Sequence, residues 1–592
     1  MRFFNETNYT KSMQYKDLVE QYFLLESTSK RLEKTKIISD LLNKVSDEEL
    51  NKVILLLQGR VFPAYDAREI GMAGQLVLKA INSATGISSS DIEKTQKSTG
   101  DLGKTAEECV SKKKQVTLFS QPLTISKVFD NLQKIAILEG EGTVNRKVSL
   151  VSELLTSASP REACYIVRTV LQDLRVGLGD GTLRDAIVWH VYGNELGIKY
   201  DKEKNNLELI NREKYNETVE TVQSAYDIAN DFGIVAIAAR KKALDKISLV
   251  PGRPCKVMLF PKAKTFEEAF ETVGKPAQAE YKYDGFRMII QKHKDDVWIF
   301  TRRLEDVKKQ FPDVLKLVSN INGDDFIVDG EAVGFKDGKY RPFQEISQRI
   351  RRKYDIAETS KDFPIVLVLF DVMFYNGKNL LNTSFIERRK LLEDNVKPIE
   401  NKLILAEKLV TDSETDMKLF FERSLSAGNE GIMIKNLKGI YKPGARVGYG
   451  MKFKPVMETL DVVIVGAEQG EGKRSDWFAT FIIAIRDGDN LVEIGRVGTG
   501  FKEKDEEGVS FNQISELLKP LITHEDGRTT YFRPEVVIEV NYEEIQKSPT
   551  YSSGFALRFP RFVRLRDDRG SQDISTLDFV IDLFSNQRGR NN

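Results

Sequence analysis

The chain of 592 residues contains few cysteines and few histidines. Its cysteines, Cys109, Cys164 and Cys255, lie far apart and form no C-x-x-C pair. This spacing argues against a disulfide framework and against a cysteine zinc site. With only 3 histidines in the sequence, a histidine-rich metal centre is excluded, and histidine is a poor candidate for the catalytic acid or base.

Long apolar runs and a strong net charge are also missing. No run of about 18 apolar residues is present, and the N-terminus has no charged-then-apolar leader, so we expect a soluble cytoplasmic protein with no membrane contact. The formal net charge of +1 does not indicate a polyanionic partner. Opposite charges segregated between domains would, however, give the same sum.

The length predicts several domains, at roughly 100–200 residues each. With 41% hydrophobic and 30% charged residues, the chain is typical of globular proteins rather than disordered ones. We divide it into an all-α domain at residues 1–244, an α+β domain at residues 245–455 and an all-β domain at residues 456–592.

Apolar residues at spacings of three and four predict helices in the first domain, over Ile37–Leu57, Ile125–Leu138 and Val148–Leu155. Ser159 followed by Pro160 predicts a helix start. The polar stretch from Ser88 to Lys114 is interpreted as an exposed loop or linker.

Short β-branched and aromatic runs predict the strands of the second domain, at Met288–Gln291, Val297–Thr301, Phe326–Val328, Ile365–Phe370 and Gly431–Lys435. Two helix-like segments interrupt them, at Thr265–Val273 and Ser384–Asp394.

In the third domain, strand-like runs separated by Gly/Asp turns fit a five-stranded barrel of the oligonucleotide-binding (OB) type. These runs are Asp461–Ala467, Ala479–Ile485, Leu491–Val497 and Val536–Tyr542, with a helix-like piece at Phe511–Leu518.

Lys282 lies in the segment that carries the most chemical information. It follows a strand-like stretch and precedes Asp284-Gly285, a strong turn signal, with Arg287 close behind. The pattern predicts an amine fixed at a strand end, with the arginine on the next, returning strand. An amine with a depressed pKa is a nucleophile towards carbonyl carbon or phosphorus. From its own residues alone, the segment fits a surface hairpin with a solvated lysine as well.

Further segments in the second and third domains contain strand-end carboxylates, cations or aromatics. They are Thr301-Arg302-Arg303, Val328–Glu331, Leu369–Asp371, Glu430–Lys435, Met451–Lys454 and Arg564–Arg569. Each alone is explained by ordinary strand ends, core aromatics or edge strands. In Met451-Lys452-Phe453-Lys454, the alternation places both lysines on one side of a strand.

In their order, these segments resemble the motifs of the nucleotidyltransferase superfamily of ATP-dependent DNA ligases, RNA ligases and mRNA capping enzymes. Lys282-Tyr283-Asp284-Gly285 is similar to the K-x-D-G motif of that superfamily. Leu174–Gly179 and Arg558–Phe562 resemble hallmarks of archaeal and eukaryotic replicative DNA ligases, so the resemblance covers nearly the whole chain.

The resemblance implies a ligase that seals nicks in duplex DNA in replication, repair and recombination, with ATP and with Mg²⁺ or Mn²⁺. Lys282 would take AMP from ATP, pass it to the 5′-phosphate of a nick, and release it when the 3′-hydroxyl attacks. The implied nucleotide-binding residues are Glu280, Arg287, Arg302, Glu331, Phe370, Arg446, Lys452, Lys454 and Arg566.

Within this set, Glu280 and Phe370 would recognise and stack the adenine, while Arg287 and Arg302 would hold ribose and the phosphate beside the nick. Glu331 and Glu430 offer either the hard oxygen ligands that Mg²⁺ prefers or hydrogen-bond acceptors for the ribose.

Two lysines, Lys452 and Lys454, would neutralise phosphate charge, and we expect them to lower the pKa of the Lys282 amine. Gly450-Met451 stands before Lys452 where relatives often have tryptophan, and Arg569 stands where the last motif usually ends in lysine. We expect Arg566, Asp568 and Arg569 to orient pyrophosphate.

The implied partner is nicked double-stranded DNA, bound by a nucleoid-associated monomer. Arg175, Gly177, Gly179 and Gly181 form the predicted DNA-binding loop, since glycines let backbone N–H groups approach phosphates. An ordinary turn between helices explains the same residues. The barrel domain is expected to swing over the opposite face of the duplex.

A basic segment at residues 112–119 resembles a sliding-clamp-binding peptide, with Gln115, Leu118 and Phe119 as its anchors. Short motifs of this kind also arise by chance, and a basic linker leading into a buried element is the alternative.

Two other functions remain open at this stage. One is an RNA ligase or guanylyltransferase, against which the helical N-terminal domain argues. The other is a catalytically dead DNA-binding scaffold, against which the intact Lys282, Glu331 and Glu430 argue. ADP, GTP or NAD⁺ in place of ATP also stay open, although the sequence shows no zinc-finger segment of the bacterial NAD⁺-dependent type.

Overall fold

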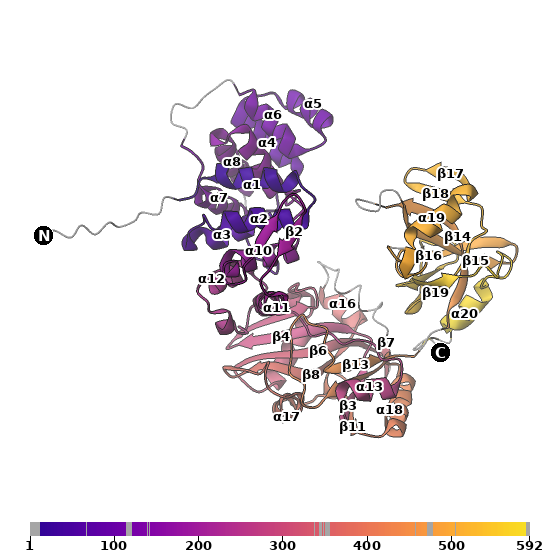
Figure 1. The fold of residues 1–592 in the computed structure, drawn as a ribbon. Helices are drawn as coiled ribbons and strands as arrows, with labels where there is room; N and C mark the ends of the chain where they lie inside the picture. The colour runs from indigo at the N-terminus through magenta and orange to yellow at the C-terminus, as the bar shows by residue number, and fades with distance from the viewer. Residues whose placement is uncertain are drawn as a thin grey trace.

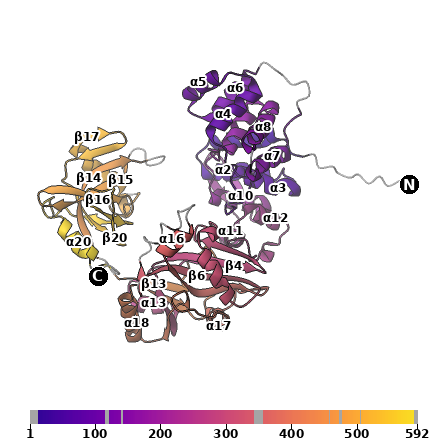
Figure 2. The same cartoon turned by 180° about the vertical axis from the view of Figure 1, so that it is seen from behind.

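The computed structural model describes residues 12–587, apart from residues 67, 114–120, 139, 141, 337, 342–345, 347–348, 350–355, 456–457, 471–476, 504 and 586. Figures 1 and 2 show a helical part, a central part built around sheets and a C-terminal strand-rich part, in chain order. The predicted fold class of each part is confirmed. The predicted boundaries after residues 244 and 455 stay predictions.

The helical part is a bundle with one small hairpin of β1 (Lys199–Asp201) and β2 (Asn206–Glu208). Its helices are α1 (Tyr15–Glu26), α2 (Arg31–Leu42), α3 (Asp47–Leu57), α4 (Gly74–Thr85), α5 (Ser89–Thr99), α6 (Leu102–Ser111), α7 (Ile125–Ile137), α8 (Thr143–Ser157), α9 (Pro160–Val170), α10 (Asp180–Tyr192), α11 (Arg212–Ala229) and α12 (Phe232–Arg240).

Several predicted helices are confirmed. Ser159 and Glu162 form a capping box at the start of α9, with Pro160 in its first turn. The stretch 37–57, which the spacing predicted as helical, is divided between two helices because the Ser46 side chain caps α3 and accepts from the backbone N–H of Glu49.

The prediction of a loop between Ser88 and Lys114 is wrong, because α5 and α6 occupy most of this stretch. Asp101 caps α6 by accepting from the backbone N–H of Gly103 at 2.7 Å. Helix α5 buries a single residue, Ile92, and the buried face of α6 includes small or polar residues such as Gly103 and Thr105. Because this region is rich in Lys, Ser and Thr, its composition suggests a loop, and the helical spacing of its few apolar residues is easily missed.

The central part contains two sheets. The larger is seven-stranded, with the order β10-β8-β6-β4-β5, β7 paired to β6 and β9 paired to β8; the smaller has the order β11-β3-β12-β13. The strands are β3 (Ala277–Lys282), β4 (Phe286–His293), β5 (Asp296–Thr301), β6 (Asp325–Lys336), β7 (Lys339–Arg341), β8 (Ile365–Tyr375), β9 (Lys378–Asn379), β10 (Leu403–Leu405), β11 (Lys408–Thr411), β12 (Gly431–Asn436) and β13 (Gly450–Phe453). The helices are α13 (Phe266–Val273), α14 (Pro312–Leu317), α16 (Ile356–Asp362), α17 (Phe385–Asn395) and α18 (Glu414–Ser426).

The C-terminal part contains the predicted five-stranded barrel. Strands β16-β15-β14-β19-β22 lie side by side, and the backbone N–H of Phe562 donates to the carbonyl of Thr499, just after β16, at 2.8 Å, which closes the ring. The strands are β14 (Leu460–Gln469), β15 (Phe478–Asp487), β16 (Asn490–Val497), β17 (Ile522–Asp526), β18 (Thr529–Phe532), β19 (Val537–Asn541), β20 (Glu544–Lys547), β21 (Phe555–Arg558) and β22 (Arg561–Leu565), with helices α19 (Phe511–Leu518) and α20 (Leu577–Ser585).

No helix in the described part of the chain combines the length and the apolar character needed to span a bilayer.

Candidate active site

Lys282 is the last residue of β3, at the point where the chain leaves the smaller sheet for the larger one. Arg287 lies on the next strand, β4, as predicted, but β4 belongs to the other sheet, so the alternative of a surface hairpin is wrong. Strand β3 pairs instead with β11 and β12, more than a hundred residues later in the chain. The turn at residues 283–285 therefore places the Lys282 amine between two sheets, not on a surface hairpin.

Gly285 allows this crossing because its backbone runs against β6. A Cβ atom added at Gly285 would lie 2.5 Å from the carbonyl oxygen of Ala332 and 2.7 Å from Cγ of Glu331. No side chain fits at such distances. The glycine of the predicted motif thus brings Lys282 close to the carboxylate of Glu331.

Glu430 lies opposite Lys282 on the smaller sheet and is held there by the backbone, since its N–H donates to the carbonyl of Lys282 at 2.8 Å. Its Oε2 atom lies 2.5 Å from Nζ of Lys282 and 2.7 Å from Nζ of Lys454. Burial alone would raise the pKa of this carboxyl, but the two ammonium groups outweigh burial and hold the pKa well below its usual range. Glu430 is therefore an anion that binds two cations.

Lys452 and Lys454 lie on the same side of β13, as the alternation predicted. Met451 is buried, and the Phe453 ring packs 4.1 Å from that of Phe266. Burial lowers the pKa of Lys452, and the neighbouring charges of Lys454 and Lys282 lower it further. Three lysines therefore converge on one small volume.

Glu331 projects from β6, in register with Arg287 on β4. Burial raises the pKa of Glu331 to about 8, although Lys282 and Arg287 favour its ionised form. With Glu430 it provides two hard carboxylate ligands of the kind that Mg²⁺ prefers. No group of three metal-ligating side chains occurs among the described residues, so a bound ion would complete its shell with phosphate or water oxygens.

Arg287 is held by a network of hydrogen bonds, and its guanidinium lies 5.6 Å from the centre of the Phe370 ring. Its Nε donates to Oδ1 of Asp329 at 2.9 Å, and its Nη1 donates to the carbonyl of Met258 at 3.0 Å. The Tyr441 hydroxyl donates to the same Asp329 carboxylate at 2.9 Å. Asp329 and Tyr441 had no predicted role, yet together they fix Arg287. Its predicted contact with ribose or phosphate stays a prediction.

Glu280 and Phe370, predicted to face the adenine, are brought together by a lysine. Glu280 is only 2% exposed; its carboxylate lies 2.5 Å from Nζ of Lys435 and 3.0 Å from Nη1 of Arg389 on α17. The same Lys435 ammonium lies 4.9 Å from the centre of the Phe370 ring. Lys435 ends a segment that the sequence singled out, but no local signal marked Arg389.

The remaining predicted arginines lie in different places. Arg302 follows β5 and is exposed. Arg446 is exposed on a loop whose backbone bridges to Leu259, and its charge contributes to the lowered pKa of Lys452.

Arg566 lies in the barrel, where its guanidinium lies 2.8 Å from Asp461 and 2.8 Å from Asp568. Arg569 binds the same Asp461 at 2.7 Å. The barrel also approaches the lysine cluster, with Glu543 lying 3.7 Å from Nζ of Lys454.

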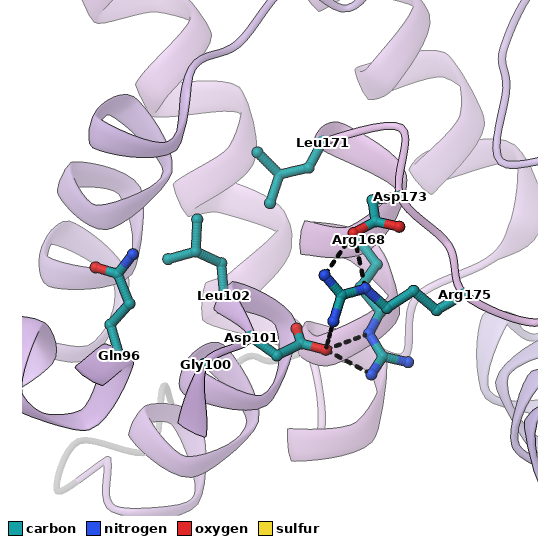
Figure 3. A pocket seen from close by; sticks show the side chains of 8 residues that line it. All are labelled: Gln96, Gly100, Asp101, Leu102, Arg168, Leu171, Asp173 and Arg175. Atoms are coloured by element: carbon teal, nitrogen blue, oxygen red, sulfur yellow. Dashed lines mark hydrogen bonds and ion pairs between the residues drawn. The ribbon is translucent and has the colours of Figure 1, made fainter. Parts of the chain in front are cut away.

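The predicted DNA-binding loop follows α9. Arg175 has a positive φ of 61° and lines a cavity of about 250 Å³ together with Asp101 and Arg168. Figure 3 shows the Asp101 carboxylate between these two guanidinium groups, at 2.7 Å from Arg168 and 3.2 Å from Arg175. Arg175 is thus an exposed cation that is held by a buried carboxylate, that of Asp101.

The glycines of this loop differ in whether a side chain would fit at their positions. Gly177 has a φ of 59°, and a Cβ added there would lie 2.7 Å from Nζ of Lys34, which donates to the Gly177 carbonyl at 3.0 Å. Gly179 is the N-cap residue of α10, with open space around it. The Gly181 carbonyl accepts from Arg31 at 3.4 Å. The predicted clamp-binding residues Gln115, Leu118 and Phe119 lie outside the described residues.

Comparison with known proteins connects this geometry to a family. The model of the DNA ligase N terminus matches residues 14–188, that of the ATP dependent DNA ligase domain residues 257–454, and that of the ATP dependent DNA ligase C terminal region residues 474–569. A DNA ligase of Nanoarchaeum equitans is 42% identical over 98% of this chain and 99% of its own length. The chain belongs to the family of ATP-dependent DNA ligases.

Other archaeal DNA ligases are similarly close in sequence. That of Thermococcus fumicolans is 40% identical to this ligase over 97% of this chain and 99% of its own length. Among solved structures, the ligase domain of LigD from M. tuberculosis is 26% identical, covers 54% of this chain and 97% of its own, and superposes with a TM-score of 0.30.

Proposed function

We propose that this ligase seals nicks in duplex DNA through a covalent AMP adduct on Lys282 and a DNA-adenylate, in replication, repair and recombination. The observation that carries the proposal is the position of Lys282 at the junction of two sheets, 2.5 Å from Glu430 and beside Glu331. A single fixed amine surrounded by lysines and carboxylates suits phosphoryl transfer, in which positioning and charge neutralisation do most of the work.

In the first step, Nζ of Lys282 attacks the α-phosphorus of ATP. A P–N bond forms, the bond from the α-phosphorus to the bridging oxygen breaks, and pyrophosphate leaves. The ammonium must first lose a proton and separate from Glu430. The low pKa of Glu430 makes this carboxylate a poor proton acceptor, so the proton passes to water.

In the second step, an oxygen of the 5′-phosphate attacks the adenylate phosphorus and Lys282 is the leaving group. In the third, the 3′-hydroxyl attacks the 5′-phosphorus, a phosphodiester forms and AMP leaves. Lys452 and Lys454 would neutralise phosphate charge, and Glu331 and Glu430 would hold Mg²⁺, or Mn²⁺ in its place, which supplies further charge neutralisation. Glu280 and Phe370 would bind the adenine, and Arg302, Arg446 and Arg566 would contact phosphates.

An adenylation assay tests this proposal. The protein is incubated with α-labelled ATP and Mg²⁺. One portion is run on a denaturing gel to detect the adduct, and the other, still native, is supplied with nicked DNA or nicked RNA. We expect a labelled adduct and sealing of DNA in the wild type, and neither in Lys282→Met. The matched control is Lys292→Met, which removes a lysine of β4 whose Nζ donates to the Gly323 carbonyl at 2.9 Å.

A labelled Lys282→Met variant, or sealing of RNA but not DNA, would contradict the proposal. Parallel reactions with ADP, GTP and NAD⁺ in place of ATP determine which nucleotides the enzyme accepts.

From the sequence alone we further propose that Gln115, Leu118 and Phe119 bind a sliding clamp. The double change Gln115→Ala and Phe119→Ala should abolish clamp pull-down and leave clamp-free sealing intact. Loss of clamp-free sealing would assign the segment a structural role instead.

A further inference from the structure

The last turns of α11 contact the predicted DNA-binding loop. The Tyr226 hydroxyl donates to Oδ2 of Asp180, the residue that opens α10 directly after that loop, at 3.1 Å. One turn earlier, Gln223 accepts from Nη1 of Arg184 on α10 at 3.0 Å. This end of α11 is therefore fixed to the helix that starts at the glycines.

The same turns of α11 contact the chain that enters the central part. Asp227 lies 2.9 Å from Nζ of Lys256, and its carbonyl accepts from the Lys256 N–H at 3.0 Å. The Lys256 ammonium also lies 4.4 Å from the centre of the Tyr226 ring. The Asp227 side chain is buried. Figure 1 shows α11 at the junction of the helical bundle and the central sheets.

Lys256 begins a segment, residues 256–263, that fixes three residues of the candidate site. The Met258 carbonyl accepts from Arg287 at 3.0 Å. The Leu259 N–H donates to the Ala445 carbonyl, next to Arg446, at 3.0 Å, and the Lys452 N–H donates to the Pro261 carbonyl at 2.8 Å. One short segment therefore connects Asp227 with the backbone around the nucleotide site.

A second contact joins Asp227 to the loop of Arg446. Gly444 has a φ of 71°, and a Cβ added there would lie 2.5 Å from Cγ of Asp227. The Asp227 carboxylate thus occupies the space that a side chain at this position would need.

We propose that Tyr226 and Asp227 are positioning residues, which set the DNA-binding loop of the helical part in register with the nucleotide site. This inference rests on the proposed function. Asp227 contacts neither candidate substrate site directly, and acts through Lys256 and Gly444. A nick must be presented to the Lys282 adduct with sub-ångström accuracy, because a misplacement of about 1 Å can cost about a hundredfold in rate.

The adduct itself forms within the central part, where Arg446 and Lys452 keep their backbone partners without Asp227. Loss of Asp227 should therefore spare adduct formation and impair only the steps that use DNA. A loss of DNA sealing without a loss of adduct formation would distinguish a positioning role from a general structural role.

The test uses full-length Asp227→Ala, Tyr226→Phe and Gly444→Ala, with Gly377→Ala as the matched control. Gly377 also has a positive φ, 81°, but no atom would lie within 4 Å of its added Cβ. For each protein we measure the rate of AMP-adduct formation, kcat and KM for nicked DNA, and Tm.

We expect Asp227→Ala and Gly444→Ala to lower kcat for the sealing of nicked DNA about tenfold, and Tyr226→Phe by less, with adduct formation changed less than about twofold. The double variant Asp227→Ala/Gly444→Ala should lose less activity than the sum of the two single losses. Removal of the carboxylate removes the clash with the methyl group and leaves only the strain of a positive φ, which Gly377→Ala measures separately.

Loss of adduct formation or of Tm in parallel with sealing would overturn the inference, as would variants that match Gly377→Ala. Additive losses in the double variant would also overturn it. A wild type that forms no adduct or seals no nick would instead contradict the proposed function.

Discussion

Lys282 and Glu430 form an ion pair of 2.5 Å across the junction of β3 and β12, and the same Glu430 oxygen binds Lys454 at 2.7 Å. An ammonium paired in this way has no lone pair with which to attack phosphorus. Because Lys454 also pairs with Glu430, the attraction between Glu430 and Lys282 is weaker than it would be in an isolated pair. The second lysine is therefore expected to matter most for releasing the nucleophile.

Replacing Lys454 should slow adduct formation. In Lys454→Met, Glu430 pairs with Lys282 alone, so the ion pair that must separate before the amine attacks phosphorus is stronger. We expect the rate of adduct formation to fall about tenfold, equivalent to about 1.4 kcal/mol. Single-turnover labelling with ATP measures this. Lys438→Met, at an exposed position after β12, is the control; an unchanged rate in Lys454→Met would contradict the argument.

Glu331 should make the stability of the ligand-free protein fall as the pH rises from 4.5 to about 8. Its folded-state pKa of about 8 lies above the ordinary 4.5, so its contribution to stability is full below pH 4.5 and is lost as the pH rises through 8. Without a divalent ion, Glu331→Gln should lose less Tm than the wild type between pH 6 and pH 9. One kcal/mol corresponds to about 2–4 °C in Tm for a domain of this size.

The change Glu414→Gln, at an exposed position in α18, is the control for Glu331 and should follow the wild type. Mg²⁺ binding to the wild type should also strengthen as the pH rises from 6 to 8, because the ion displaces the Glu331 proton. Calorimetric titrations that show identical pH dependence in Glu331→Gln would refute this assignment.

Gly285→Ala should separate the two sheets at Lys282. The added Cβ would lie 2.5 Å from a backbone oxygen that cannot rotate away, so β3 or β6 must shift. We expect a loss of about 1–3 kcal/mol in the free energy of unfolding and about a hundredfold in adduct formation. Gly495→Ala, whose Cβ would meet its nearest atoms at 3.8 Å, is the control. Wild-type adduct formation in Gly285→Ala would show that the close approach is unnecessary.

Arg175 should contribute one phosphate contact to DNA binding. Arg175→Met is expected to reduce the slope of log K against log salt by about 0.9, the value for one neutralised phosphate of duplex DNA, without any sequence preference. Binding of a nicked duplex is measured by fluorescence anisotropy at several salt concentrations. Lys94→Met removes an exposed cation from α5 and should leave the slope unchanged. An unchanged slope in Arg175→Met would exclude it from the interface.

The sequence predicted elements best where capping and periodicity are local. The helix start at Ser159 and the helix at Phe511–Leu518 are confirmed. The helices α5 and α6 were missed because their composition is polar: α5 buries only Ile92, and the buried face of α6 includes small or polar residues such as Gly103 and Thr105. The Asp284-Gly285 turn signal was real, but it could not reveal that β3 and β4 pair with strands in different sheets.

By itself, the sequence determined the three fold classes, the candidate nucleophile Lys282 and the set of charged segments around it, because each depends on residue type and short-range spacing. Only the tertiary structure decided which charges meet. Three sets of contacts join positions that are distant in the chain. Glu280 pairs with residues of α17 and β12, and Glu430 is shared by two lysines. Asp227 contacts Lys256 and Gly444. Ion-pair strength depends on distance and burial in three dimensions, which linear spacing does not encode.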